Sequence, residues 1–166
     1  MPITPFHFGP GALIHAIAPK HISFLAFCAA NVLIDVEPLY YMLTAQPPLH
    51  RFFHTYLGAT IIAFITACIF LGALRIAPRL RLPDLLGWQS LKTWPIWLGA
   101  AGGSYSHIVL DSVMHADIVP LAPFSEVNAL YRVVTLGELH LFCLVSALAA
   151  GILMAIRYLI REDFSS

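Results

Sequence analysis

The stretch Y56-L-G-A-T-I-I-A-F-I-T-A-C-I-F-L-G-A-L74 decides the fold class of this chain, because it contains no charged side chain. Its length of roughly 20 residues is what an α-helix needs to cross the hydrocarbon core of a bilayer. A second stretch, 139–156, has a similar length and is interrupted only by His140. Both stretches predict membrane-spanning helices.

The composition of the whole chain supports a membrane protein. Of its 166 residues, 59% are hydrophobic and 11% are charged, and its mean hydropathy is +0.80, whereas soluble domains carry about 25% charged residues. A soluble domain of this size could not bury so much apolar surface. We expect one integral membrane domain over residues 1–166. Lys and Arg together number nine, as do Asp and Glu, so no basic surface is available for direct nucleic-acid binding.

Two more apolar segments carry ionisable residues: 21–43 contains Asp35 and Glu37, and 94–113 contains His107 and Asp111. Ionisable groups at membrane depth are costly, so they are expected to face a protein interior and to serve a function. A shorter apolar piece, 11–18, is too brief to span unless the residues around His7 extend it. The sequence therefore predicts an all-α, polytopic membrane helix bundle with about four spans and a short N-terminal helix.

The basic residues predict an orientation. One loop holds Arg75, Arg79, Arg81 and Lys92, and the C-terminal tail holds Arg157 and Arg161. The positive-inside rule places both segments in the cytoplasm, with Lys20 at the cytoplasmic start of the 21–43 span. The loop 44–55 then lies outside. For a bacterial protein this predicts the inner membrane with the periplasm beyond it.

Counting residues from these basic positions at roughly 1.5 Å per helical residue gives a depth for each polar side chain. The polar residues of different segments fall into one layer near the outer face, at roughly 20 Å for His7, 22 Å for Asp35 and His107, 26 Å for His140, 28 Å for Asp111 and 31 Å for His54. We interpret this convergence as the main sign of a functional site.

The residue types in this layer point to a divalent transition metal. The motifs H50-R-F-F-H54 and H107-I-V-L-D111 each place two ligand types at i,i+4 spacing, which on a helix brings both side chains to one face. Imidazole and carboxylate ligands without thiolate suit Zn²⁺, Mn²⁺ or Fe²⁺. We expect Zn²⁺, as one or two ions.

Asp35 and Glu37 add carboxylates to the same layer. They would point to different sides of a continuous helix, but Pro38 disfavours helix at Glu37 and allows the chain to turn there. On this interpretation Asp35 ligates the metal, Glu37 acts as general base or as a second ligand, and Arg51 orients a substrate phosphate.

Several motifs resemble those of the predicted membrane-bound metal-dependent hydrolases, a bacterial inner-membrane family described as LexA-binding. They are T-P-F-H-F from Thr4, I-D-V-E around Asp35, H-R-F-F-H-T from His50 and S-H-I-V-L-D from Ser106, and the resemblance extends to about Phe124. It implies a metal site formed by His7, Asp35, Glu37, His50, His54, His107 and Asp111. The H-x-x-x-D element is also similar, more distantly, to zinc-dependent phospholipase C.

The chain departs from the family pattern in two places. The acidic motif lacks the leading Pro and trailing His of P-D-x-D-H, and Met114-His115-Ala116-Asp117 stands where many members read T-P-x-G. His115, and with it Asp117, is a candidate replacement for a lost ligand.

Simpler interpretations exist for each residue. His15, His21 and His140 suit packing roles, and His50 with His54 suits an interfacial anchor. His107 and Asp111 could form a metal-free hydrogen bond, and Asp35 with Glu37 could mark a helix end.

The leading hypothesis for function is a metal-dependent hydrolase at the outer leaflet, acting on a phosphoester or another ester of a lipid or lipid-linked substrate. A haem-binding electron-transfer protein is the second hypothesis, because histidines on several spans can supply axial ligands. A non-catalytic membrane adaptor or a transporter is the third. The oligomeric state does not follow from the sequence.

Overall fold

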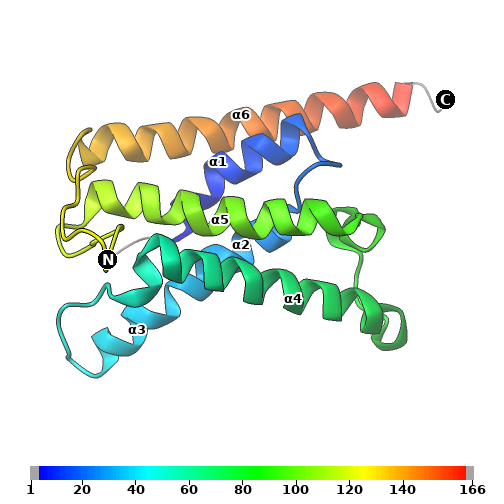
Figure 1. The fold of residues 1–166 in the computed structure, drawn as a ribbon. Helices are drawn as coiled ribbons and strands as arrows, with labels where there is room; N and C mark the ends of the chain where they lie inside the picture. Colours follow the sequence, from blue (N-terminus) through cyan, green and yellow to red (C-terminus); the bar gives the residue numbers. More distant parts are fainter. Residues whose placement is uncertain (1–3, 164–166) are drawn as a thin grey trace.

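The charge-free stretch that predicts a span forms most of one long helix, α4 (Tyr56–Leu80). The computed structural model describes residues 4–163, and within that range every regular element is helical (Figure 1). The other elements are α1 (Thr4–Ile17), α2 (Phe24–Ile34), α3 (Val36–Leu43), α5 (Thr93–Met114), α6 (Leu136–Asp163) and the 3-10 helices η1 (Phe52–His54) and η2 (Leu85–Ser90). The all-α prediction is confirmed.

Three helical segments are long and apolar enough to cross a membrane: Phe24–Leu43, Tyr56–Leu80 and Leu136–Ile160. At most 33% of the most apolar window in any of them is buried inside the protein. Large apolar side chains such as Phe64 on α4 and Leu148 on α6 are exposed instead. Apolar helix faces of this extent need lipid or another protein to cover them, and a membrane provides the lipid.

The predicted fourth span, 94–113, is a helix but is not among the segments apolar enough to count as a span. This helix, α5, is long enough, yet it carries Ser104, His107, Asp111 and Ser112, all of them buried. It packs against α2 and α4, and neighbouring helices cover its polar side chains. Because those neighbours take the place of lipid, α5 does not need an apolar surface all round.

Two glycines bring α5 close to α2. A Cβ on Gly99 would lie 2.3 Å from the backbone oxygen of Ser23, and one on Gly103 would lie 2.3 Å from that of Phe27. Real side chains cannot approach so closely, so only glycine allows this contact. Small residues serve the same purpose at many membrane helix interfaces.

The segment predicted as one span over 21–43 is divided at Asp35, which ends α2 and begins α3. The prediction that Pro38 would turn the chain out of helix at Glu37 is wrong, because Glu37 lies in the first turn of α3. Proline is tolerated in a first helical turn, since the N–H groups there have no partner within the helix. The break therefore falls three residues before the proline.

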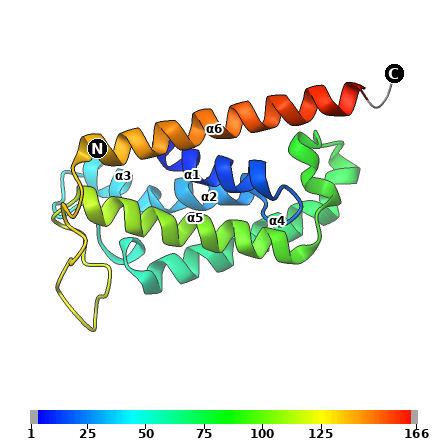
Figure 2. The ribbon, with the colours of Figure 1, turned by 90° about the horizontal axis from the view of Figure 1, so that it is seen from above.

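The N-terminal helix α1 extends back through His7, which is the extension that the short apolar piece 11–18 needed in order to reach further into the membrane. It lies alongside α6 (Figure 2), and the guanidinium of Arg157 donates hydrogen bonds to the carbonyls of Ala16 and Ile17. These bonds satisfy carbonyls at the C-terminal end of α1, which lack partners within the helix. Arg157 thus lies within α6 rather than in a tail beyond the last helix.

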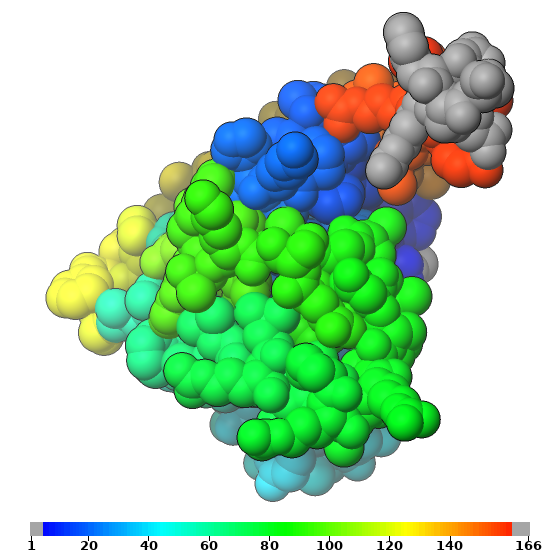
Figure 3. All heavy atoms as spheres, turned by 90° about the vertical axis from the view of Figure 1, so that its right-hand side faces the viewer, coloured from blue at the N-terminus to red at the C-terminus, as the bar shows by residue number. Residues whose placement is uncertain are grey.

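The two ends of the bundle differ. The end of α4, the start of α5, the α1–α2 connection and the C-terminal end of α6 gather at one end, seen face-on in Figure 3. The connections and helix ends there contain the basic residues that predicted the cytoplasmic side. The opposite end holds α3, η1, the start of α4 and the end of α5 (Figure 1). Which end faces the cytoplasm stays a prediction.

Candidate metal centre

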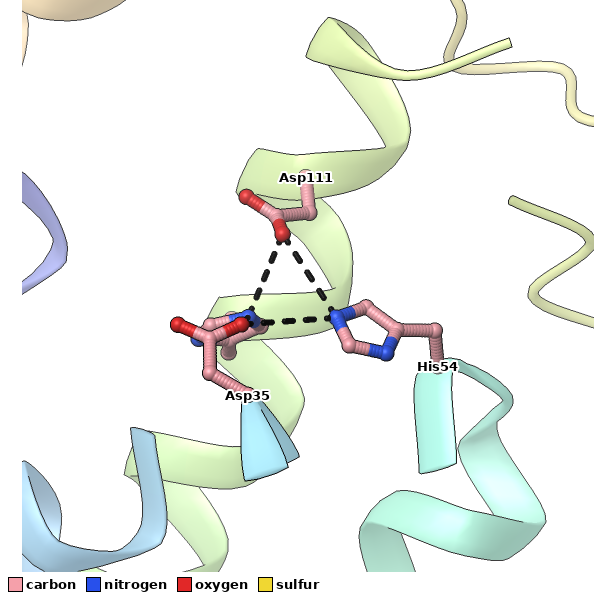
Figure 4. A group of neighbouring side chains, drawn as sticks. Asp35, His54 and Asp111 are labelled. Carbon is pink, nitrogen blue, oxygen red and sulfur yellow. Dashed lines mark ion pairs between the residues drawn. The ribbon is translucent and has the colours of Figure 1, made fainter. Parts of the chain in front are cut away.

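Four of the predicted ligands meet at the end of the bundle opposite the basic residues. Asp35, His54, His107 and Asp111 each offer one ligand atom, and these four atoms all lie within 4.8 Å of one another. We call them the four-donor group. Figure 4 shows Asp35, His54 and Asp111 pointing toward one another from three different elements. A buried cluster of this composition could hold a metal ion.

The local sequence explains how His54 reaches this group. It ends η1, directly before Thr55, whose side chain accepts a hydrogen bond from the N–H of Gly58 and caps α4. A Cβ on Gly58 would lie 2.0 Å from the carbonyl oxygen of Phe52. Glycine at this position therefore lets η1 fold over the first turn of α4 and point the His54 ring inward.

The distances suit a tetrahedral ion. His107 Nε2 lies 3.2 Å from both Asp35 Oδ1 and Asp111 Oδ2, and His54 Nε2 lies 3.8 Å and 3.6 Å from the same two oxygens. Zinc bonds of about 2.0–2.1 Å place neighbouring ligand atoms of a tetrahedron about 3.3 Å apart. The group is thus slightly wider than a zinc tetrahedron on the His54 side and matches it on the His107 side.

The contacts of His54 and His107 with Asp111 do not have hydrogen-bond geometry. Among the described residues, His54 Nε2, His107 Nε2 and Asp111 Oδ2 are buried and have no hydrogen-bond partner. Buried polar atoms without partners are rare in folded proteins, and a bound cation would satisfy lone pairs that converge in this way. The residues therefore fit a divalent cation better than they fit the metal-free hydrogen bond considered for His107 and Asp111.

Asn31, which no sequence motif singles out, orients His107. Its amide nitrogen donates to the carbonyl of Phe27 (2.9 Å), so its Oδ1 faces His107 Nδ1 at 3.1 Å. With Nδ1 as the donor to Asn31, Nε2 keeps a lone pair directed at the two carboxylates. Metal-bound histidines are commonly held in this way. The sequence signal that could have revealed Asn31 is a polar residue one helical turn before Asp35. In the structure this residue is fully buried.

Glu37 lies beside His54 and outside the four-donor group. Its Oε2 accepts hydrogen bonds from the backbone N–H groups of Phe53 (2.8 Å) and Arg51 (3.2 Å), and it lies 3.8 Å from His54 Nδ1. The carboxylate thus fixes the segment that carries His54 and faces the ring nitrogen away from the other ligands. This geometry supports a positioning role more directly than the predicted role as base or ligand.

His7 also adjoins the centre without belonging to the group. Its Nδ1 is 3.2 Å from His107 Nδ1, and its Nε2 is 3.1 Å from Asp111 Oδ1, the second oxygen of that carboxylate. The N-terminal helix therefore closes one side of the site.

A second group shares Asp111 with the first. His50, Asp111 and His115 offer ligand atoms within 4.8 Å of one another, and we call them the three-donor group. The rings of His50 and His115 lie 4.4 Å apart between centroids, tilted by 35°. The replacement ligand proposed from the departure at residues 114–117 is thus close enough to act as one.

Asp117 holds His50 in place. Both oxygens of Asp117 are 3.0 Å from His50 Nδ1, and one accepts the backbone N–H of His50 at 3.3 Å. Nδ1 therefore donates, and His50 Nε2 is left buried without a partner among the described residues. Burial lowers the pKa of His50, neighbouring His54 lowers it further, and Asp117 only partly opposes this.

Two other ionisable groups near His50, namely His115 and Asp117, have shifted pKa values as well. Burial lowers the pKa of His115. Burial raises the pKa of Asp117, but the hydrogen bonds with His50 outweigh this effect and leave the pKa below its ordinary value. Both histidines therefore favour the neutral form, and Asp117 the charged form. Neutral imidazole is the form that binds metals.

The H50-R-F-F-H54 motif does not form the expected helical pair. His50 lies in the loop before η1, and His54 ends η1. Their rings still lie 4.6 Å apart, but each belongs to a different donor group. The tight 3-10 turn, not i,i+4 helix geometry, brings them together.

The remaining predicted residues lie apart from the donors. The Arg51 guanidinium bonds to the carbonyls of Gln46 and Pro48 and lies 3.7 Å from the Tyr41 ring centroid. His15, His21 and His140 lie outside both groups, in contact with Ile22, Trp94 and Phe6 respectively, as their packing interpretation predicts. The phosphate-binding role of Arg51 stays a prediction.

A cavity of about 430 Å³ adjoins both groups. Its polar lining residues are Asp35, His50, His115 and Asp117, and its apolar lining residues are Val32, Val36, Pro38, Leu39, Met42 and Leu49. The cavity thus combines metal-ligand residues with walls contributed mainly by α2 and α3. Its size is in the range of small-molecule binding sites.

Comparison with known proteins gives no match to a family model, a curated protein or a solved structure. The resemblance to the membrane-bound metal-dependent hydrolases therefore stays a prediction, and the function is argued from the geometry of the site.

Proposed function

We propose that this protein is a membrane-embedded metal-dependent hydrolase that cleaves a phosphoester or another ester of a lipid or lipid-linked substrate. The observation that carries the proposal is the four-donor group, whose two imidazoles and two carboxylates converge at distances suited to Zn²⁺. The distribution of basic residues favours placing this end of the bundle at the outer face of a bacterial inner membrane.

The residues have distinct tasks in this proposal. Asp35, His54, His107 and Asp111 hold the ion, while Asn31 and Glu37 orient the two histidines. With these four donors in place, an ion would polarise the bond to be cleaved, and it would lower the pKa of a water toward 7 only by expanding to a fifth ligand. The carboxylate of Asp35 also lines the cavity, so a substrate in the cavity lies next to the centre.

The cavity supports an amphiphilic substrate. Its polar residues lie beside the donor groups, and its apolar residues come mainly from the Phe24–Leu43 segment. An ester headgroup fits the polar part, and acyl chains fit the apolar walls. A substrate with one polar and one apolar end would reach this site from the membrane.

Metal analysis of the purified protein tests the proposal. We expect at least one Zn²⁺ or similar ion per chain in detergent-purified protein, and its loss in His107→Ala. His21→Ala is the matched control, because His21 packs on Trp94 away from the donors. Hydrolysis of bis(p-nitrophenyl) phosphate, p-nitrophenyl butyrate and phosphatidylglycerol vesicles should fall with the metal.

Other results would contradict the proposal. Equal metal content in wild type, His107→Ala and His21→Ala would remove the metal site. A haem absorption band in the visible spectrum would favour the electron-transfer protein. Tightly bound metal without hydrolysis of any of the three probes would favour the adaptor or transporter.

A further inference from the structure

The three-donor group has features that one four-coordinate ion does not explain. His50 Nε2 and His115 Nε2 are buried and have no hydrogen-bond partner among the described residues. Neither histidine belongs to the four-donor group. An ion held by that group alone would leave both nitrogens unsatisfied, and each buried polar atom without a partner destabilises the fold.

Asp111 connects the two groups. It is a member of both, and its two oxygens face different neighbours: Oδ2 faces His54 and His107, and Oδ1 faces His7. A carboxylate with two oxygens can serve two cations at once. Both oxygens are buried without a hydrogen-bond partner in the described part of the chain, and Oδ1 also lies 3.1 Å from His7 Nε2, so a cation there would share this oxygen with that ring.

Each group has one residue that holds a histidine in place, Asn31 in the first and Asp117 in the second, and we call these two the helper residues. They make the same kind of contact in both groups. Asn31 accepts from Nδ1 of His107 in the four-donor group, and Asp117 accepts from Nδ1 of His50 in the three-donor group. Each leaves Nε2 free to ligate. A carboxylate behind a histidine is a typical outer partner of a metal ligand. An interfacial anchor, the simpler interpretation of His50, needs no such partner.

We propose that His50, Asp111 and His115 form a second divalent-cation site, and that Asp111 bridges it to the first as a two-metal centre whose substrate is a phosphoester. This inference rests on the proposed hydrolase function and deepens it. Two-metal sites are typical of enzymes that act on phosphate esters, where both the attacking and the leaving oxygen need stabilisation.

The second site is the more open of the two. It has three protein donors where the first has four, and hydrolytic zinc sites keep one position for water or substrate. Two of its three donors, His50 and His115, line the cavity, whereas of the four donors of the first site only Asp35 does. The second cation would therefore contact the phosphate group of a substrate directly, and the first would be more enclosed.

Metal stoichiometry tests the second site. Metal-free protein in detergent is titrated with Zn²⁺ by calorimetry, and the loaded protein is measured by elemental analysis. We expect two ions per chain in wild type, one in His115→Ala and two in His140→Ala, the matched control that packs on Phe6. The ion retained by His115→Ala also shows that this variant is folded.

A second readout does not depend on counting. Protein loaded with Mn²⁺ should show an electron paramagnetic resonance spectrum of two coupled ions, because Asp111 joins them. His115→Ala should show the spectrum of a single, uncoupled ion. Hydrolysis of bis(p-nitrophenyl) phosphate should fall in this variant by about a hundredfold or more, in the range typical of removing a group that stabilises transition-state charge.

The outcomes separate this inference from the proposed function. One ion in wild type that is lost in His107→Ala and kept in His115→Ala would overturn the second site and leave the hydrolase proposal intact. No ion in any of the proteins would overturn both. Two ions in wild type and two in His115→Ala would place the second ion elsewhere and contradict the assignment to His50 and His115.

Discussion

The two donor groups differ in what holds them in place. The four-donor group draws its members from the end of α2, from η1 and from α5, at points where long helices pack together. The three-donor group takes His50 from the 44–51 loop and His115 from the residue that caps α5. The first group is thus fixed mainly by helix packing, whereas the two histidines that only the second group contains are held by loops that adjoin the cavity.

This difference suggests that the two ions have different roles. Four donors that are mostly fully buried suit an ion that stays in place, and three donors of which two line a cavity suit one that meets the substrate. Asp111 belongs to both, so the groups are not independent. Substitutions at residues that serve only one group should still lower the metal affinity of that group more than that of the other.

The largest effect is expected from Asp111→Asn. The substitution keeps the size of the side chain but removes the charge that both cations share. We expect metal affinity to fall by more than the roughly 10–100-fold typical of outer-shell changes, for both ions. Elemental analysis after dialysis measures this loss. Ser112→Ala, a change at the next buried residue, should keep both ions, and a loss there equal to that in Asp111→Asn would mean that unfolding is the cause.

Changes at the two helper residues should separate the groups. Asn31→Ala removes the acceptor for His107 Nδ1 and should weaken the first ion by about 10–100-fold. Asp117→Asn removes the charge behind His50 and should weaken the second by a similar factor. Zn²⁺ titration of the two variants gives the two affinities. Equal weakening of both ions in both variants would contradict the existence of two distinct sites.

Glu37→Gln should have a smaller effect on the metal. Glutamine keeps an oxygen for the backbone N–H groups of Arg51 and Phe53, and the carboxylate is 3.8 Å from His54 Nδ1, beyond hydrogen-bond range. We expect the affinity of the first ion to fall by about tenfold, at the low end for outer partners. Unchanged metal affinity with a hundredfold lower kcat would support the general-base role predicted from the sequence.

The smallest effect on the metal is expected from Gly103→Ala, which acts on stability instead. The added Cβ would push α5 away from Phe27 on α2, and overpacking of this kind costs about 1–3 kcal/mol. Gly72→Ala on α4, where nothing lies within 4 Å of the added Cβ, is the matched control. Thermal unfolding in detergent compares them, and equal melting temperatures would show that the close α2–α5 contact does not limit stability.

Much of the fold could be predicted because it follows from local patterns. The charge-free stretch 56–74 indicates a span on its own, since no soluble core could bury it. The layer of polar residues also followed from the sequence, because a helix advances a fixed distance per residue. His54, His107, Asp35 and Asp111 meet in the structure as that count implied. His140 shares the predicted depth but packs on Phe6, as its packing interpretation predicts, because depth along a helix says nothing of direction around it.

The boundaries and the roles of individual residues were harder to predict. The helix break at Asp35 instead of Glu37 depends on where proline is tolerated in a new first turn. From the sequence, α5 resembles a membrane span interrupted by polar residues. In the structure, neighbouring helices cover those polar side chains. The sequence did not predict that Asn31 and Asp117 each hold a histidine in place, because they do so through hydrogen bonds to residues far away in the chain.

The sequence by itself determined that this protein is helical and apolar enough for a membrane, and that histidines and carboxylates from distant segments lie at a common depth. Only the tertiary structure decided which of them meet, that Glu37 and His7 adjoin the centre instead of joining it, and that Asp111 belongs to two groups. The physical reason is one of scale. Hydrophobic length and helical rise are averages over many residues, whereas a metal site depends on donor distances that a shift of about 1 Å in helix packing would change.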